Sequence, residues 1–441
     1  MKIIMISLGC DKNLVDSEFM LGAVLDNGYE LTDDETLADI IIINTCCFIH
    51  DAKEESIETI LEMAEYKKHG SCKGLIVCGC LAQRYHDEII KEIPEVDAII
   101  GTTGHDDIIK AINDVIDKKF SSVMKDINYL TPQNTRRVFS TGTEYSYLKI
   151  AEGCNKHCTY CIIPKLRGSY RSVPMEDLLK QAVYLADNGV RELIIVAQET
   201  TLYGTDLYGE DKLPELLNRL CQVDGIEWIR LLYAYPEDIT EQLIDVMKKQ
   251  PKICNYIDMP IQHGADSILK RMGRRTSKED ILNKIALLRR EIPDITIRTS
   301  LITGFPGETD EEHKELLDFV NEVKFDRLGV FIYSEEEDTP AASYDNQVDE
   351  RVKQKRYDEL MQAQQQIAFD NAKKHIGKVM DIIIEGEIPE DNIYIGRTSM
   401  DAPKIDGCVF LPLTGGYITG DIIKAEITEA VDYDLLAVPC M

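Results

Sequence analysis

Residues 146–161 read SYLKIAEGCNKHCTYC, a short apolar segment that runs directly into a group of closely spaced cysteines. The first six residues have the composition of a buried strand. Cys154, Cys158 and Cys161 follow at Cys-x3-Cys-x2-Cys spacing. Parallel α/β folds keep their sites at the carboxyl ends of their strands, so this loop stands where a site is expected.

The same alternation of strand and helix continues downstream of this loop. Strands are predicted at residues 146–151, 192–197, 228–233, 256–260, 295–303 and 327–333, and helices at 175–188, 213–223, 237–249, 277–290 and 311–323. Six such units predict a TIM-type barrel that is open by two strands, a partial (β/α)6 barrel. A long polar helix follows at about 349–374.

Upstream, the first 120 residues show another α/β alternation. Strands are predicted at residues 2–7, 39–44, 74–77 and 98–100, and helices at 16–26, 51–68, 88–92 and 106–117. This pattern predicts a doubly wound parallel-sheet domain. Residues 121–142 are polar and contain Pro132, Asn134 and Gly142, which is typical of a linker.

The end of the chain changes character to short strands at residues 379–385, 393–398, 407–411 and 421–430. Turns with Gly, Asp and Pro separate them, which predicts a small OB-like all-β barrel. The sequence therefore predicts an α/β multidomain protein. Its predicted segments are 1–120, the linker 121–142, the barrel 143–373 and the terminal all-β barrel 374–441.

The charge of the chain is strongly negative. Its 441 residues include 49 Lys and Arg against 78 Asp and Glu, a net charge of −29. Residues 374–441 alone carry five basic and twelve acidic side chains. Such a field repels polyanions, so the charge disfavours nucleic acid as the main substrate and favours a basic protein or a small molecule.

Cysteine content and the start of the chain indicate the compartment. The short apolar run 3–6 does not have the form of a signal peptide, and no apolar run reaches the roughly 18 residues of a membrane span. Thirteen cysteines without an export signal are typical of a reducing compartment, where they bind metals or catalyse. We expect a cytoplasmic protein with no membrane partner.

The loop of Cys154, Cys158 and Cys161 is the strongest chemical signal. Thiolates are ligands of iron–sulfur clusters, and three of them leave one iron of a 4Fe-4S cluster without a protein ligand. That iron can chelate S-adenosylmethionine, whose one-electron cleavage yields a 5′-deoxyadenosyl radical. The alternative is a zinc knuckle with His157 as fourth ligand.

Three further cysteines follow three predicted strands of the first domain. Cys10, Cys46 and Cys80 therefore fall on one edge of the parallel sheet, where they can hold a second cluster. Cys47 and Cys78 lie within two residues of these candidates, and the sequence does not exclude Cys47 as a ligand. Taken singly, each cysteine is also compatible with a buried apolar role.

Several blocks of sequence resemble the radical S-adenosylmethionine methylthiotransferases over nearly the whole chain. They are residues 7–13 (SLGCDKN) with 15–18 (VDSE), 79–85 (GCLAQRY), and the cysteine loop continued by 162–168 (IIPKLRG). The chain is similar to the RimO type in residues 196–204 (VAQETTLYG), 258–263 (DMPIQH), 333–336 (YSEE) and 339–341 (TPA). The domain order also resembles that family, with an amino-terminal cluster domain, a radical barrel and a terminal TRAM barrel.

This resemblance implies a methylthiotransferase with two 4Fe-4S clusters and S-adenosylmethionine. Its substrate would be an aspartate β-carbon of the small-subunit ribosomal protein S-twelve. Cys154, Cys158 and Cys161 would hold the radical cluster, and Cys10, Cys46 and Cys80 an auxiliary cluster that carries the sulfur to be transferred. Contacts to S-adenosylmethionine are expected from Tyr160, Gln198 and Arg298. No catalytic side chain separate from the cluster ligands is expected, and the electron donor and sulfur source are not identified by the sequence.

Two other functions remain open at this point. One is a methylthiotransferase of the MiaB type, which modifies tRNA adenosine and would need a basic stripe within this acidic chain. The other is a non-catalytic iron–sulfur protein that interacts with the ribosome. Cleavage of S-adenosylmethionine by the reduced protein distinguishes an enzyme from the latter. Where the family has small residues, this chain has Cys47 and Cys78.

Overall fold

The computed structural model describes residues 1–132 and 136–440. They group by their contacts into two compact units. The first comprises Met1–Ser140, Lys149–Asp177 and Ser334–Ala342, and the second Thr141–Leu148, Leu178–Tyr333 and Ser343–Met441. Asn134 of the predicted linker lies outside the described residues. Because neither unit is one continuous segment, the segment boundaries proposed from the sequence stay a prediction.

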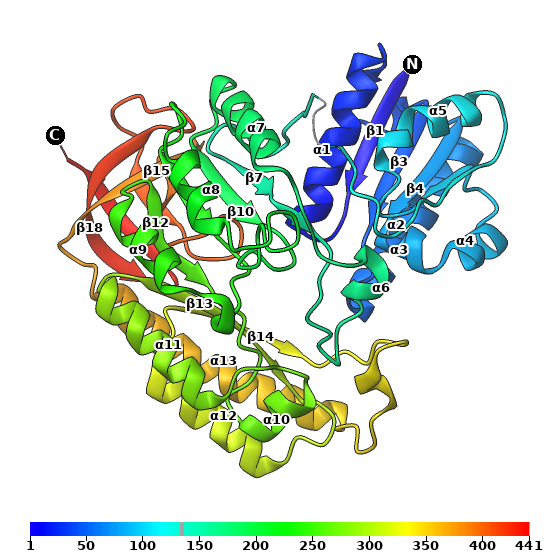
Figure 1. Cartoon of the computed structure of the whole chain (residues 1–441). Helices are drawn as coiled ribbons and strands as arrows, with labels where there is room; N and C mark the ends of the chain where they lie inside the picture. Colours follow the sequence, from blue (N-terminus) through cyan, green and yellow to red (C-terminus); the bar gives the residue numbers. More distant parts are fainter. Residues whose placement is uncertain (133–135, 441) are drawn as a thin grey trace. The chain divides into compact units, whose positions relative to one another are not determined.

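The first unit contains a six-stranded parallel sheet, drawn in blue and cyan in Figure 1. Its order is β2-β1-β3-β4-β5-β6, with β1 Lys2–Ser7, β2 Glu30–Leu31, β3 Ile40–Thr45, β4 Gly74–Gly79, β5 Ala98–Ile100 and β6 Ser121–Val123. Strand β3 contains four consecutive isoleucines, all fully buried. A strand with apolar residues on both sides must be covered on both faces of its sheet.

Helices cover both faces of this sheet. Ile40 and Ile42 pack with α1 (Asp11–Asp26) and α5 (Ile108–Ile116). Ile41 and Ile43 pack on the other face, against the remaining helices α2 (His50–His69), α3 (Cys80–Arg84) and α4 (His86–Glu92). The predicted doubly wound domain is confirmed.

The predicted start of the linker differs from the structure. Residues 121–123 form β6, which pairs in parallel with β5. Ser121 and Val123 are buried, so this segment belongs to the sheet. Three residues are too short to show a period in the sequence, and the neighbouring strand supplies the hydrogen bonds that define them as a strand.

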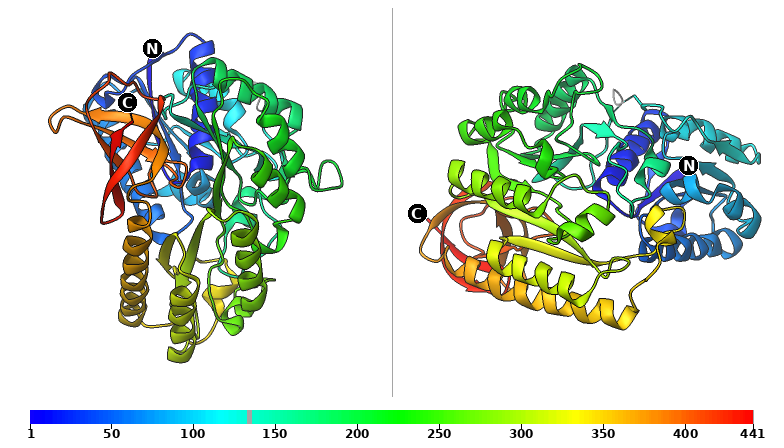
Figure 2. Two further views of the ribbon diagram at one scale, coloured as in Figure 1. Left: turned by 90° about the vertical axis from the view of Figure 1, so that its left-hand side faces the viewer. Right: turned by 60° about the horizontal axis from the view of Figure 1, so that its bottom comes forward.

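The second unit contains a six-stranded sheet in the order β14-β13-β12-β11-β10-β7. Its strands are β7 Tyr145–Lys149, β10 Glu192–Val196, β11 Trp228–Leu231, β12 Ile253–Asp258, β13 Thr296–Thr303 and β14 Arg327–Ile332. Its helices include α7 Met175–Asp187, α8 Leu213–Leu220, α9 Glu241–Lys249, α10 Asp266–Arg271, α11 Lys278–Glu291, α12 Asp310–Val323 and α13 Glu350–Lys373. The six predicted β/α units of an open barrel are confirmed, and only the short α10 is additional. Helices α11, α12 and α13 run side by side (Figure 2).

The C-terminal part of this unit is a closed five-stranded barrel in the order β15-β16-β17-β19-β18. Its strands are β15 Val379–Ile388, β16 Ile393–Thr398, β17 Val409–Pro412, β18 Ile422–Val431 and β19 Asp434–Pro439, drawn in orange and red in Figure 2. The predicted small all-β barrel is confirmed, with β19 as a strand that the prediction omitted. In the described part of the chain, no helix is both long and apolar enough to cross a bilayer.

Candidate functional site

The three N-terminal cysteines lie at the carboxyl ends of adjacent strands. Cys10 follows β1 and is the N-cap residue of α1, Cys46 directly follows β3, and Cys80 follows β4 as the first residue of α3. Strand β1 lies between β2 and β3, so the strands that follow it in the chain are added on both sides of it. Ligands of open α/β sheets bind at such a switch point.

Close backbone packing holds the Cys10 loop against Cys46. Gly9 has φ +85°, and a Cβ atom placed on it would lie 2.6 Å from Cys46 Cβ and 2.8 Å from Cys46 Sγ. A side chain at position 9 would therefore displace Cys46 as well as strain the backbone. Asn13 Nδ2 donates to the carbonyls of Leu8 at 3.1 Å and Thr45 at 2.9 Å, which ties the two loops together.

Cys46 and Cys80 lie in surroundings that change the pKa of their thiols. Burial raises the pKa of Cys46 to about 12, and the neighbouring Cys80 and Cys10 contribute to the rise. Burial also raises the pKa of Cys80. Thiols in such surroundings are neutral until a metal displaces their protons, which couples metal binding to proton release. This donor set fits an iron–sulfur cluster.

Cys78 has different surroundings from these three, whereas Cys47 lies near two of them, since Cys80 and Cys46 add to the rise that burial causes in the pKa of Cys47. Cys78 lies inside β4 and packs on the sheet face of α1 and α5, whereas Cys80 packs on the opposite face. The thiol of Cys78 donates to the Ile43 carbonyl at 3.4 Å. Cys47 is fully buried on the face of Cys80, and its own carbonyl accepts from Arg84 at 3.3 Å.

We expect the single substitutions Cys47→Ala and Cys78→Ala to leave the iron content of the reconstituted protein unchanged. Cys78 lies on the opposite face of the sheet from Cys80, and it is Cys46 rather than Cys47 that lies against Gly9 of the Cys10 loop. Iron and sulfide assays after anaerobic reconstitution check this. Loss of half the iron in either variant would make that residue a cluster ligand.

The second cysteine group lies between β8 (Ala151–Glu152) and α6 (Ile163–Arg167). Cys154 and Cys158 are buried, and Cys161 is half-buried. The amide of Lys156 donates to Cys154 Sγ at 3.4 Å, and the amide of Cys161 to the Cys158 carbonyl at 3.0 Å. Burial raises the pKa of Cys161, with Cys158 and Cys154 adding to it. The thiols of Cys154 and Cys158 therefore lie close enough to Cys161 to interact with it electrostatically.

In the residues that the structure describes, no three His, Cys, Asp or Glu side chains are placed to hold a single metal ion. His157, the proposed fourth ligand of a zinc knuckle, is exposed and has φ +53°. The thiolates of a cubane cluster bind separate irons and need not converge on one point. Both cysteine groups thus suit a cluster better than a single ion.

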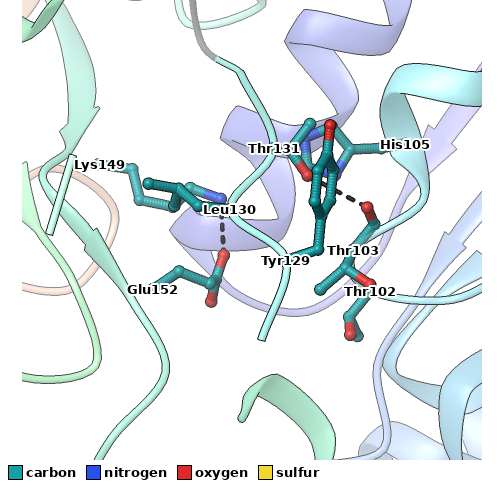
Figure 3. A pocket seen from close by; sticks show the side chains of 8 residues that line it. All are labelled: Thr102, Thr103, His105, Tyr129, Leu130, Thr131, Lys149 and Glu152. Carbon is teal, nitrogen blue, oxygen red and sulfur yellow. Dashed lines mark hydrogen bonds and ion pairs between the residues drawn. The ribbon is translucent and has the colours of Figure 1, made fainter. Parts of the chain in front are cut away.

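A small cavity lies in the same unit as both cysteine groups (Figure 3). Its eight lining residues are Thr102, Thr103, His105, Tyr129, Leu130, Thr131, Lys149 and Glu152. It has room for about one water molecule, so it cannot hold S-adenosylmethionine. Thr103 Oγ1 and His105 Nδ1 have no hydrogen-bond partner among the described residues, and a bound water would satisfy them.

The residues predicted to contact S-adenosylmethionine fall in both units. Tyr160 is half-buried in the cysteine loop of the first unit. Gln198 follows β10 in the second unit, which places it at a carboxyl end. Arg298 is the third residue of β13, and its guanidinium pairs with Asp258 at 2.7 Å and Asp406 at 3.7 Å. Their role in binding the cofactor stays a prediction.

Sequence reasoning assigned no role to Arg84 or to segment 334–342, which contact each other close to the cysteine groups. Arg84 pairs with Glu336 at 3.1 Å, and both side chains are buried. Arg84 also donates to the Glu337 carbonyl at 2.7 Å, and Ala341 N donates to the Thr159 carbonyl at 2.9 Å. Segment 334–342 therefore contacts Arg84, the last residue of the helix that begins at Cys80, and Thr159, which lies between Cys158 and Cys161. In the sequence, residues 333–336 (YSEE) indicated only a resemblance to the family and did not predict this contact.

Three family models match the chain. Residues 2–101 match the uncharacterized protein family UPF0004, residues 148–320 the radical SAM superfamily and residues 376–439 the TRAM domain. The superfamily match implies a 4Fe-4S cluster and S-adenosylmethionine, in agreement with the donor set of the cysteine loop.

Solved structures with the same fold include the radical S-adenosylmethionine methyltransferase TsrM of Kitasatospora setae. That chain has a TM-score of 0.56 at 13% identity, with 86% of this chain and 78% of that chain covered. The cobalamin-dependent radical enzyme OxsB has a TM-score of 0.52 at 16% identity, with 81% and 56% covered. Likeness at this identity concerns the fold alone.

Curated relatives are much more similar. The ribosomal protein uS12 methylthiotransferase RimO of Lachnoclostridium phytofermentans is 60% identical over 436 residues, with 99% of both chains covered. The protein of the same name from Clostridioides difficile is 52% identical, with 99% of this chain and 98% of that protein covered. With such identity over almost its full length, this chain belongs to the RimO family of radical S-adenosylmethionine methylthiotransferases.

Proposed function

We propose that this chain attaches a methylthio group to the β-carbon of an aspartate in ribosomal protein uS12. The observation that carries the proposal is the presence of two separate cysteine triads in one compact unit, at the carboxyl ends of a parallel sheet and in the loop before α6. The relatives named uS12 methylthiotransferase support it, because they match the chain from end to end.

The two triads are assigned to two 4Fe-4S clusters. Cys154, Cys158 and Cys161 hold one, and Cys10, Cys46 and Cys80 hold the other. When bound, the first supplies one-electron cleavage of S-adenosylmethionine and the second supplies the sulfur for transfer. The chain's own contribution is to bury four of the six thiols, with Cys161 half-buried and Cys10 exposed, and to hold the Cys10 and Cys46 loops together through Asn13 and Gly9.

Three side chains are proposed to orient S-adenosylmethionine. Tyr160 lies within the cysteine loop and offers an aromatic face for the adenine. Gln198 offers an amide at a strand end, and Arg298 offers a guanidinium that Asp258 already orients. No separate general acid or base is proposed.

A basic protein fits the charge of this chain better than a nucleic acid. The net charge of −29 attracts a basic ribosomal protein and repels tRNA. We place the reaction in the cytoplasm, where the many free thiols stay reduced. An electron donor and a sulfur source of unidentified kind are required as partners.

The test is anaerobic reconstitution with iron and sulfide, followed by incubation of the reduced protein with S-adenosylmethionine. Recombinant uS12 and unmodified tRNA are supplied in parallel and analysed by mass spectrometry. We expect the mass gain of a methylthio group replacing a hydrogen, on an aspartate-containing peptide of uS12.

Two results would contradict this substrate. The same mass gain on an adenosine would assign the chain to the tRNA-modifying type and show that net charge does not predict the partner. Absence of S-adenosylmethionine cleavage in a fully loaded protein would favour a non-catalytic iron–sulfur protein.

A further inference from the structure

A buried network of four charged residues, Asp16, Lys149, Glu152 and Arg167, lies in the first unit. We call it the Asp16–Arg167 network. Lys149 contacts both carboxylates, and Arg167 Nη1 lies 2.8 Å from Asp16 and 3.1 Å from Glu152. All four side chains are at most 8% exposed. Two cations face two anions, so the network has no excess charge of its own.

The network joins the sequence neighbourhoods of both cysteine triads. Asp16 lies on α1, which begins directly after Cys10. Glu152 ends the short strand before Cys154, and Arg167 ends α6, which follows Cys161. We call the segment from Cys154 to Arg167 the radical loop. Through this network the charge of Arg167, at the end of the radical loop, is held near the N-terminal thiols.

Arg167 extends beyond the network toward these thiols. Its Nη2 donates to Asn13 Oδ1, and Cys80 Sγ lies 4.0 Å from the same oxygen. Asn13 is fixed by its two bonds to the Leu8 and Thr45 carbonyls. The guanidinium therefore has a defined position next to Cys80. Burial raises the pKa of Cys80, and the Arg167 guanidinium opposes that rise.

A fixed cation next to thiolate ligands has a known physical consequence. The reduction potential of an iron–sulfur cluster depends on hydrogen bonds to its sulfurs and on nearby charge. A reduced cluster carries one more negative charge, which a buried guanidinium stabilises in a medium of low dielectric constant. Lys149 carries the same charge and contacts the same two carboxylates, Asp16 and Glu152. Arg167 differs from it by the additional bond to Asn13, which lies beside Cys80.

We infer that Arg167 is a positioning residue that places a buried positive charge from the radical-loop side beside the N-terminal thiolates, and thereby raises the reduction potential of the cluster they hold. The inference rests on the proposed assignment of Cys10, Cys46 and Cys80 as cluster ligands. It adds a function for Arg167 that is distinct from ligation.

The test compares two double variants that each remove one cation and one anion from the network. Asp16→Asn with Arg167→Met removes the guanidinium, and Asp16→Asn with Lys149→Met keeps it. Both are made in the full chain with Cys154, Cys158 and Cys161 replaced by Ala, so that only the N-terminal cluster is present. The readout is a redox titration monitored by electron paramagnetic resonance.

We expect the Arg167→Met double variant to lower the reduced-to-oxidised ratio at a fixed potential at least tenfold, which is about 59 mV for a one-electron couple. The Lys149→Met double variant is expected to remain close to the parent. Arg167→Lys alone, which keeps the charge without the planar fork, is expected to lie between them.

Equal potentials in the two double variants would overturn the inference and leave the ligand assignment intact. Absence of any cluster in the parent with Ala at the three radical-loop positions would instead overturn the assignment, and the inference with it. An Arg167→Lys potential as low as that of the Arg167→Met double variant would show that charge is not the cause.

Discussion

Replacing Cys154, Cys158 and Cys161 with alanine is expected to reduce cleavage of S-adenosylmethionine to the level of a protein-free control. The open iron to which this substrate binds has no other protein support in the proposed assignment. About half of the iron is expected to remain, held by Cys10, Cys46 and Cys80. Iron assay and quantification of 5′-deoxyadenosine after dithionite reduction check both expectations.

The complementary triple variant separates the two roles. Alanine at positions 10, 46 and 80 is expected to keep cleavage of S-adenosylmethionine while abolishing methylthio transfer to uS12. A control with equal loss of thiols replaces Cys72, Cys221 and Cys254, which are buried as Cys46 and Cys80 are. We expect it to retain both activities. Cleavage in the variant without Cys154, Cys158 and Cys161 would show that the radical chemistry lies elsewhere.

The positions of the cysteine triads could be predicted because they depend on local patterns. Strands β1, β3 and β4 are apolar runs with clear ends, so Cys10, Cys46 and Cys80 could be placed on one sheet edge from the sequence alone. The structure adds the sheet order, which makes the three strands neighbours. Periodicity does not contain that order, because pairing connects residues far apart in the chain.

Short elements could not be predicted for a related reason. β2 has two residues and β6 has three, so neither shows a period. β2 is a strand because it pairs with Lys2 and Ile3 of β1, and β6 is a strand because it pairs with β5. Helix α3, with Cys80 at its first position, has five residues and is defined by its contacts with the sheet.

The buried charges were the largest feature that the sequence did not predict. Lys and Arg are mostly exposed in proteins, and nothing in the local sequence indicates that Lys149 and Arg167 are buried. Their partner Asp16 lies 133 positions from Lys149 and 151 positions from Arg167. No local rule connects them, although the adjacency of Arg167 to the cysteine loop could have drawn attention to it.

A second buried network, in the second unit, allows the other prediction of large effect. Glu192 of β10 accepts from Arg230 of β11 at 2.7 Å and pairs with Arg397 of β16 at 2.5 Å. All three side chains are at most 1% exposed. Burial alone would raise the pKa of Glu192, but the two guanidiniums outweigh it and hold this pKa below its ordinary value. One carboxylate thus joins the parallel sheet to the five-stranded barrel.

We expect Glu192→Gln to lower the free energy of unfolding of this unit by about 3–5 kcal/mol, because it leaves buried guanidiniums without their counter-charge. Arg397 keeps its contact with Glu385, whereas Arg230 retains, among the described residues, the Ser399 carbonyl and the face of Tyr256. The measurement is urea denaturation of the reconstituted protein, followed by fluorescence of Trp228. This is the only tryptophan of the chain, and it lies opposite Glu192 in the β10–β11 register.

The matched control is Asp381→Asn, which removes the partner of Lys424 on the surface of the same barrel. Both side chains of that pair are more than half exposed, so its loss is expected to cost less than about 1 kcal/mol. A Glu192→Gln effect as small as that of the control would mean that water reaches the network. In that case burial of Glu192 could not be what fixes the five-stranded barrel to the sheet. A large effect that is restored by adding Arg230→Met would identify the uncompensated cation as its cause, since removing both charges of a buried pair costs far less than removing one.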